Sequence, residues 1–194
     1  CSTPLAEKME TFRWASEDVI DAVRFLIKND SVFGIDKTKI ILAGSSAGAE
    51  GVLTAVYNDD FIFNNQPAYK NFEPAALISF GGAIPDRRYL VKSNAVPAVF
   101  FHGIQDVLVP YTTASHHFCD ENEPGYFILS GARDLADRLK ELDQSYMICT
   151  FRNLGHEAAN VPFEFLDIVF NFMNDVVVNK EFFQAEFVQD YKRK

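Results

Sequence analysis

Four short apolar runs constrain the fold of this chain most, because each is continuous rather than alternating with polar residues. The runs are KIILAG (39–44), AALISFGGAI (75–84), AVPAVFFHG (95–103) and SYMICTF (145–151). A strand that is apolar on both sides must be covered on both faces, which is typical of parallel sheets. The stretches between the runs carry helical patterns, as expected when helices form the crossovers of such a sheet. The sequence therefore predicts an α/β fold with a mostly parallel sheet.

Three segments show the spacing of amphipathic helices. The first is 16–30, with Ser16 as the expected N-cap and a wide apolar stripe. The others are 132–143 and the long apolar segment 163–178, which Pro162 precedes near its first turn. The stripe of the first helix consists of Val19, Ile20, Val23, Phe25, Leu26 and Ile27.

Two long polar segments, 58–74 and 109–131, do not fit the alternation of strands and helices. The two segments are polar and aromatic and together are rich in Asn, Pro and Gly, and both are expected on the C-terminal side of the sheet. Long connections in a compact domain are usually functional. Two interpretations stay open for each segment, a lid or substrate-binding loop and a mobile surface loop.

Length and charge limit the number of domains and the classes of partner that this chain can have. The 194 residues, 48% of them hydrophobic, are enough for one domain spanning 1–194. The formal net charge is −9 and no basic stripe interrupts it, which argues against a nucleic-acid partner or an anionic membrane surface. No apolar run approaches the roughly 18 residues of a spanning helix, so we expect no membrane span.

The three cysteines are an odd number and cannot all pair within the chain. Cys149 lies in the apolar run 145–151 and is expected to be a buried strand residue. A Cys1–Cys119 disulfide is one pairing that the sequence leaves open.

The stretch Gly44-Ser45-Ser46-Ala47-Gly48 joins the first predicted strand to a helical pattern. It fits G-x-S-x-G with Ser46 at the centre. A nucleophile at the tip of such a sharp turn takes a strained backbone, and its neighbours must be small where strand and helix pass closely. We predict that Ser46 is the nucleophile, and that Ser45 is structural.

A serine nucleophile needs a base, which is in turn oriented by an acid. Asp106 follows the third predicted strand and His156 follows the fourth, so the order along the chain is serine, acid, histidine. The carboxyl ends of parallel strands share one edge of the sheet, where catalytic groups gather. The sequence therefore predicts a Ser46–Asp106–His156 triad.

Other candidates were weighed against these residues. His102 precedes the acid at the end of its strand and is expected to fix the loop. HHFCD (116–120) contains potential metal ligands but lacks the separated pairs of a dependable zinc site, so no metal is predicted. Asp86, after the second predicted strand, is the reserve candidate for the acid.

Together GSSAG, FHGIQDVLVPY and NLGHE resemble the α/β-hydrolase fold, in its esterase and lipase-like branch. The segment from ASEDVIDAVRFLIKND to GSSAGA is similar to carbohydrate-esterase-like members, including acetyl- and feruloyl-esterase-like ones. The resemblance reaches to about residue 178. It implies a three-layer fold around an eight-stranded, mostly parallel sheet. It also implies ester hydrolysis through an acyl-enzyme at Ser46, Asp106 and His156, with no cofactor and with the Ala47 N–H in the oxyanion hole. The substrate would be a small-molecule or carbohydrate ester, and export is favoured over a cytoplasmic location.

The chain departs from the family pattern ahead of Ser46. Family members have further strands there, with a glycine-rich loop that gives the second oxyanion donor. We therefore expect this chain to be the C-terminal two-thirds of a hydrolase domain, and a preceding segment to supply strands and donor. An open sheet edge could otherwise pair with another chain and form an oligomer. A serine peptidase of the same fold and a non-catalytic binding or structural domain stay as alternatives.

Overall fold

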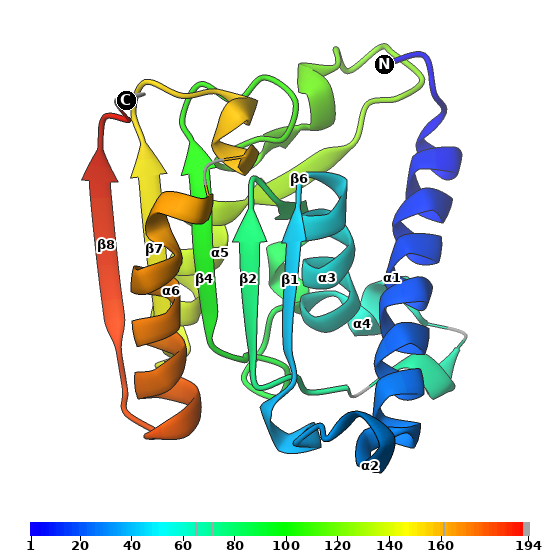
Figure 1. Ribbon diagram of the computed structural model, residues 1–194. Helices are drawn as coiled ribbons and strands as arrows, with labels where there is room; N and C mark the ends of the chain where they lie inside the picture. Colours follow the sequence, from blue (N-terminus) through cyan, green and yellow to red (C-terminus); the bar gives the residue numbers. More distant parts are fainter. Residues whose placement is uncertain (65, 71, 161, 192–194) are drawn as a thin grey trace.

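The computed structural model describes residues 1–64, 66–70, 72–160 and 162–191 (Figure 1). Its centre is a sheet of five parallel strands in the order β1-β2-β4-β7-β8. These strands are β1 (Ile41–Ser45), β2 (Ala76–Phe80), β4 (Ala98–Gly103), β7 (Tyr146–Phe151) and β8 (Gln184–Gln189). Each of the first four strands falls in one of the four apolar runs, and only β1 extends beyond its run, by Ser45. The α/β fold class predicted from the sequence is confirmed.

Strand β8 was not predicted, so the expectation of four sheet strands in this chain was wrong. β8 pairs in parallel with β7 at the edge of the sheet. Its sequence, QAEFVQ, mixes polar and apolar residues, and its side chains are exposed or half-buried. An edge strand needs no continuous apolar run, because solvent reaches part of its surface.

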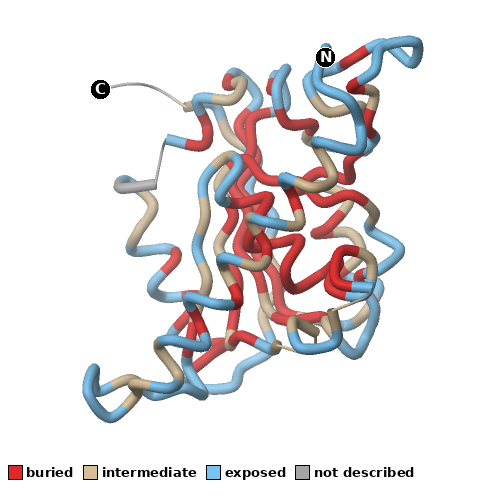
Figure 2. The backbone as a smooth tube through the Cα atoms, turned by 90° about the vertical axis from the view of Figure 1, so that its right-hand side faces the viewer, coloured by how far each residue is buried: buried red, intermediate tan, exposed pale blue. Residues whose placement is uncertain are grey.

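Helices cover both faces of the sheet, which gives three layers. The long helices are α1 (Leu5–Lys28), α3 (Ala47–Tyr57), α5 (Ala132–Glu141) and α6 (Leu166–Met173), which continues as a π-helical turn over Asn174–Val178. On one face α3 and α5 pack against the strands, and on the other face α6 does. The most deeply buried backbone runs through the centre, between the helical layers (Figure 2). The first face buries Leu53, Leu77, Phe100, Leu135, Leu139 and Ile148, and the second buries Val99, Phe101, Met147, Cys149, Val169 and Phe172.

Helix α1 begins eleven residues earlier than expected, so Ser16 is not its N-cap. Ser16 lies in the middle of the helix, fully buried, and its hydroxyl donates to the carbonyl oxygen of Phe12 at 2.8 Å. A serine inside a helix can satisfy its hydroxyl by bonding the carbonyl four residues back. The residue at the N-cap position is Pro4.

Helix α1 packs on α3 rather than directly on the sheet, and its apolar stripe is only partly covered. Ile20 and Val23 are buried, whereas Phe25 is 59% exposed and Trp14 is 55% exposed. The helix α2 (Asp30–Phe33) follows. No helix in the described parts of the chain combines the length and apolarity needed to cross a bilayer.

Both long polar segments contain secondary structure and core residues. Within 58–74 lie α4 (Asp59–Ile62) and a 3₁₀ turn (Pro67–Tyr69), while residues 65 and 71 fall outside the described residues. Within 109–131 lie β5 (Ala114–Ser115) and β6 (Ile128–Gly131), which form a small antiparallel sheet with β3 (Ala83–Ile84). Both segments pack on α1 and α3 through Ile62, Phe63, Val109, Phe127 and Leu129. Whether either acts as a lid stays a prediction.

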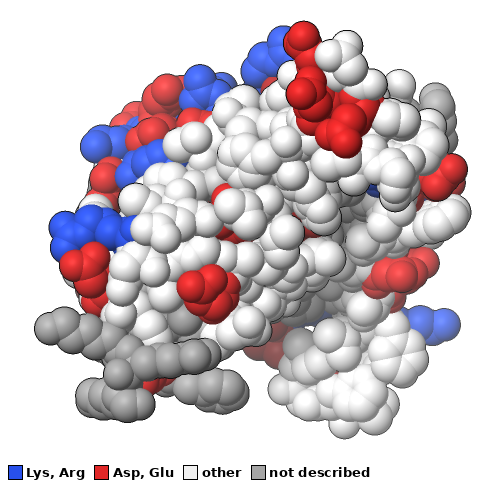
Figure 3. Space-filling model, turned by 90° about the horizontal axis from the view of Figure 1, so that it is seen from above, with Lys and Arg blue, Asp and Glu red and all other residues white. Residues whose placement is uncertain are grey.

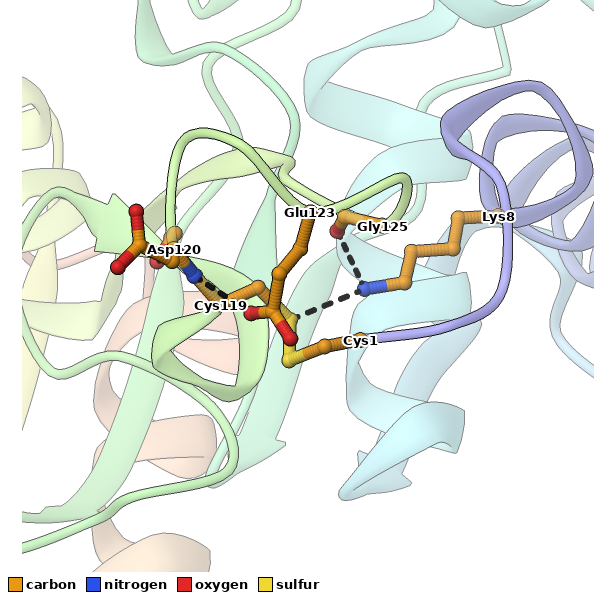
Figure 4. Close-up of a disulfide and its surroundings, with 7 residues drawn as sticks. Cys1, Lys8, Cys119, Asp120, Glu123 and Gly125 are labelled. Atoms are coloured by element: carbon orange, nitrogen blue, oxygen red, sulfur yellow. Dashed lines mark hydrogen bonds between the residues drawn. A yellow bond between two sulfur atoms is a disulfide. The ribbon is translucent and has the colours of Figure 1, made fainter.

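The first residues of the chain are fastened to segment 109–131 (Figure 4). Cys1 and Cys119 form a disulfide, which is one of the pairings that the sequence left open. The Gly125 N–H donates to the Cys1 carbonyl at 2.8 Å, and Lys8 Nζ donates to the Gly125 carbonyl at 2.7 Å. The third cysteine, Cys149, is buried in β7 as predicted, and burial raises the pKa of its thiol to about 12.

Strand β1 forms one edge of the sheet, and its pairing with β2 is its one strand pairing among the described residues. Its residues are half-buried or exposed, and Ala43 is exposed although it belongs to an apolar run. The outer side of β1 is therefore a free edge of the kind that other strands can pair with.

Candidate active site

The turn between β1 and α3 has the geometry of a nucleophile elbow. Ser46 lies between the two elements with φ 54° and ψ −126°, a conformation that costs a non-glycine residue about 1–3 kcal/mol. A Cβ on Gly44 would lie 2.3 Å from the Gly48 carbonyl oxygen, so this position must be glycine. At Gly48, by contrast, a Cβ would meet none of the described atoms within 4 Å. The expectation that close packing requires a small residue at position 48 was therefore wrong.

The three side chains of the predicted triad meet at the carboxyl edge of the sheet. Ser46 Oγ is 2.8 Å from His156 Nε2, and His156 Nδ1 is 2.8 Å from Asp106 Oδ2. They come from separate parts of the chain: the elbow after β1, the turn after β4 and a 3₁₀ helix (His156–Asn160) after β7. A Cβ on Gly103 would lie 2.3 Å from the Leu154 carbonyl oxygen. A glycine at the end of β4 therefore lets the segment before His156 pass close to this strand.

The carboxylate of Asp106 is buried and surrounded by hydrogen-bond donors. Burial alone would raise its pKa, but four donors outweigh burial and lower the pKa to about 2. The side-chain donors are His102, 3.3 Å away, and His156. The backbone N–H groups of Leu108 and Val109 both donate to Oδ1 at 2.9 Å. Asp106 is therefore a fixed negative charge beside the His156 ring.

Comparison with known proteins bears on the fold. The BD-FAE family model matches residues 6–84, which include the elbow. Two solved structures align with about nine-tenths of the chain at 18% identity. One is an esterase, Est2, from Thermogutta terrifontis with a TM-score of 0.57, and the other is a puromycin-hydrolysing peptidase from Mycobacterium tuberculosis with a TM-score of 0.54. The chain has the α/β-hydrolase fold.

Within this fold class the chain is similar to esterase-like proteins. One curated relative is endo-1,4-beta-xylanase B of Butyrivibrio fibrisolvens, 28% identical over 171 residues that make up 87% of this chain. The chain spans 26% of that relative, 27% of the peptidase chain and 65% of the esterase chain. It therefore corresponds to part of each of these proteins.

Two neighbours of the triad make contacts that support its geometry. Ser45 Oγ donates to the Ala159 carbonyl at 2.9 Å, so this serine bonds the turn that carries His156. His102 is fully buried, and its Nε2 lies 3.1 Å from the Val109 carbonyl and 3.3 Å from Asp106 Oδ2, so that one Nε2–H is shared between these two acceptors. The first contact joins the elbow to the turn that carries His156, and the second lies within the segment that carries Asp106.

Ala47 is the first residue of α3. The helix does not use the N–H groups of its first turn, so these remain available to an external acceptor. The positive end of the helix dipole also lies here.

The other candidates from the sequence are not brought to the triad. Asp86 starts a 3₁₀ turn and pairs with Arg88 at 2.6 Å. Among the described residues, one group with metal-ligand spacing is Cys1, Cys119 and Glu123. Both of its sulfur atoms are joined in the disulfide, which is not the thiolate form that binds metal.

Sequence reasoning missed a buried carboxyl close to the site. Glu50 lies one turn after Ser46 on α3 and is 6% exposed. Burial, and then the Asp106 charge, raises its pKa to about 8. His116 Nε2 lies 3.4 Å from Glu50 Oε1, and burial lowers the pKa of this histidine to about 4. The signal in the sequence was one charged residue in the otherwise uncharged helix AGAEGVLTAVY.

The face at the carboxyl ends of the strands is mostly uncharged. Seen from above, its centre is formed by uncharged residues, and the charged side chains gather toward its margins (Figure 3). The loops around Asp106 expose apolar side chains, among them Ile104, Val107, Leu108 and Phe118.

Proposed function

We propose that this chain carries the catalytic centre of a serine hydrolase that cleaves carboxylic esters through an acyl-enzyme. The observation that carries the proposal is the continuous hydrogen-bonded chain Ser46–His156–Asp106 at a strained elbow. The order and roles of these groups match the logic of a nucleophile, a base and an orienting acid.

In the proposed reaction His156 Nε2 takes the proton of Ser46 Oγ as that oxygen attacks the ester carbonyl. Asp106, held ionised by its donors, accepts from His156 Nδ1–H and stabilises the imidazolium that forms. His156 then protonates the departing alcohol. Water repeats the sequence on the acyl-enzyme and releases the acid.

The tetrahedral intermediate needs donors for its oxyanion. We assign one donor to the Ala47 N–H at the start of α3. A second donor from a segment ahead of Cys1 stays a prediction. Loss of one such donor costs about 10²–10³ in kcat.

The proposed substrates are short acyl esters on carbohydrate. The uncharged face above the sheet suits a neutral ester, and the name of the relative, a xylanase, supports a carbohydrate context. The disulfide supports an exported protein, since such bonds persist in oxidising compartments.

A serine peptidase is the second candidate, because a peptidase is among the structures with this fold. Two kinds of substrate distinguish the esterase from the peptidase. The ester substrates are p-nitrophenyl acetate and acetylated xylan, and the peptidase substrates are aminoacyl p-nitroanilides. We expect turnover of the esters alone. The full-length protein should also react with a fluorophosphonate probe, whereas Ser46→Ala should not, and Ser45→Ala is the matched control that should keep labelling. Absence of labelling in the wild type would favour the non-catalytic alternative.

A further inference from the structure

Glu50 is the one charged residue of α3, and it points into a buried site next to the elbow. Its backbone N–H donates to the Ser46 carbonyl at 3.0 Å, so it belongs to the first turn of the nucleophile's helix. Its Oε1 is buried and has no hydrogen-bond partner among the described residues. A buried carboxyl is costly unless it finds a polar partner.

The polar group facing Glu50 is the ring of His116. Nε2 lies 3.4 Å from Oε1, and the ring packs edge-on against Phe12 of α1 with centroids 6.2 Å apart. The backbone N–H of His116 donates to the Phe127 carbonyl at 2.7 Å. Glu50 and His116 thus connect α3 to segment 109–131.

Hydrogen bonds connect the residue after His116 to Asp106, the acid of the triad. The His117 N–H donates to the Leu108 carbonyl at 2.8 Å, and the Leu108 N–H donates to Asp106 Oδ1 at 2.9 Å. His117 and Phe118 both have left-handed backbone conformations, with φ of 58° and 51°. Two such residues in succession persist only where the surroundings hold them. Contacts on both sides hold these two residues in place: His116 contacts Glu50, and Cys119 forms the disulfide with Cys1.

We infer that Glu50 and His116 form a buried positioning pair, which couples the helix that begins at Ser46 to the turn that holds Asp106. The inference rests on the proposed function, because the alignment of Ser46, His156 and Asp106 is what the pair maintains. In this role both residues act through the triad and do not touch the reacting atoms.

Burial is the main reason why the pair favours its uncharged form, since it raises the pKa of Glu50 and lowers the pKa of His116. The charged or titratable groups that act on the pair electrostatically are Lys8 of α1, the amino group of Cys1, Asp106 of the β4 turn and His117 of the loop. Of these, Lys8 lowers the pKa of Glu50, whereas Asp106 raises it. A carboxylate at position 50 would lie in the field of the Asp106 carboxylate and would be poorly solvated, in agreement with the raised pKa of Glu50. The side-chain amide of Gln at position 50 should therefore preserve the role of the uncharged carboxyl, whereas the methyl group of Ala should not.

Kinetics of the full-length protein on p-nitrophenyl acetate test the inference. We expect Glu50→Gln to keep kcat within about threefold, and Glu50→Ala and His116→Ala each to lower kcat about tenfold or more with KM nearly unchanged, since small misplacements of catalytic groups are costly. His116→Gln, which keeps a polar group near the Nε2 position, should restore part of the loss. The double alanine variant should be no slower than either single variant, because coupled residues are not additive.

Hydrogen exchange gives a readout that does not depend on activity. In Glu50→Ala, the amides of Leu108 and His117 should exchange faster, and in Glu50→Gln they should not. Thr54→Ala, one turn further along α3 and equally buried, is the control for a general loss of packing and should leave both kcat and these amides unchanged.

Unchanged exchange in Glu50→Ala, or equal losses of kcat in Glu50→Gln and Glu50→Ala, would overturn the inference. An inactive wild type with altered exchange in Glu50→Ala would instead count against the proposed function alone.

Discussion

Removal of the Cys1–Cys119 disulfide should destabilise the protein strongly, because the bond closes a very long loop. The two cysteines are 118 residues apart in sequence. Chain-entropy arguments give about 5 kcal/mol at 25 °C for a loop of this length, within the range of about 2–5 kcal/mol found when native disulfides are removed. Typical domains have a free energy of unfolding of about 5–15 kcal/mol, so the bond would supply a large share of it.

The assay is equilibrium urea unfolding followed by circular dichroism, with and without reductant. With a slope of about 2 kcal/mol per molar urea, the wild-type midpoint should fall by about 2.5 M when the bond is reduced. The double variant Cys1→Ser/Cys119→Ser should unfold at that lower midpoint and should not respond to reductant. Cys149→Ala is the matched control, since it removes the free thiol and should leave the response to reductant intact. A reductant-induced fall of less than about 0.5 M would refute the reasoning, since it would show that the unfolded chain gains little freedom.

Four further outcomes are expected. Ser46→Ala should abolish ester hydrolysis, whereas Ser45→Ala should keep most of it and lose only about 1 kcal/mol of stability with its hydrogen bond; equal losses of activity would contradict this. Asp106→Asn should lower kcat about 10⁴-fold with unchanged circular dichroism, and a near-normal rate would remove Asp106 from its role. The folded-state pKa of Glu50, about 8, exceeds its usual 4.5, so the folded state holds a proton that the unfolded state releases. The wild type should therefore lose about 3 kcal/mol more stability than Glu50→Gln between pH 5 and pH 8, as urea unfolding at several pH values can check. Residues 1–194 expressed alone should self-associate through the free edge of β1 and show little turnover, and a monomeric, fully active product on sedimentation would contradict that.

The sheet and its order along the chain were largely predictable, because strands buried on both faces leave continuous apolar runs. β8 left no such run, since an edge strand can keep polar side chains such as Gln184 and Glu186. The early start of α1 was also missed. The hydroxyl of Ser16 resembles a cap in sequence, although in the structure it bonds back to Phe12 inside the helix.

The meeting of Ser46, Asp106 and His156 could be anticipated, because each follows its own strand and parallel strands end at one edge. The pairing of Glu50 with His116 could not. Their 66-residue separation carries no spacing rule, and only the fold of segment 109–131 brings that histidine back onto α3. The same histidine could be read in the sequence only as a potential metal ligand.

The attachment of Cys1 to segment 109–131 has a practical consequence for the design of fusion proteins. Both described ends of the chain lie at the side of the molecule where the strands end (Figure 1). A tag or reporter domain joined ahead of Cys1 would be held close to the Asp106 turn, because the disulfide fixes its attachment point two residues from His117. A domain joined after Tyr191 would instead leave beside β8, at the opposite edge of the sheet. Immobilisation of the protein through a domain joined after Tyr191 should therefore leave the Ser46 site accessible. Immobilisation through a domain joined ahead of Cys1 should instead hinder large substrates.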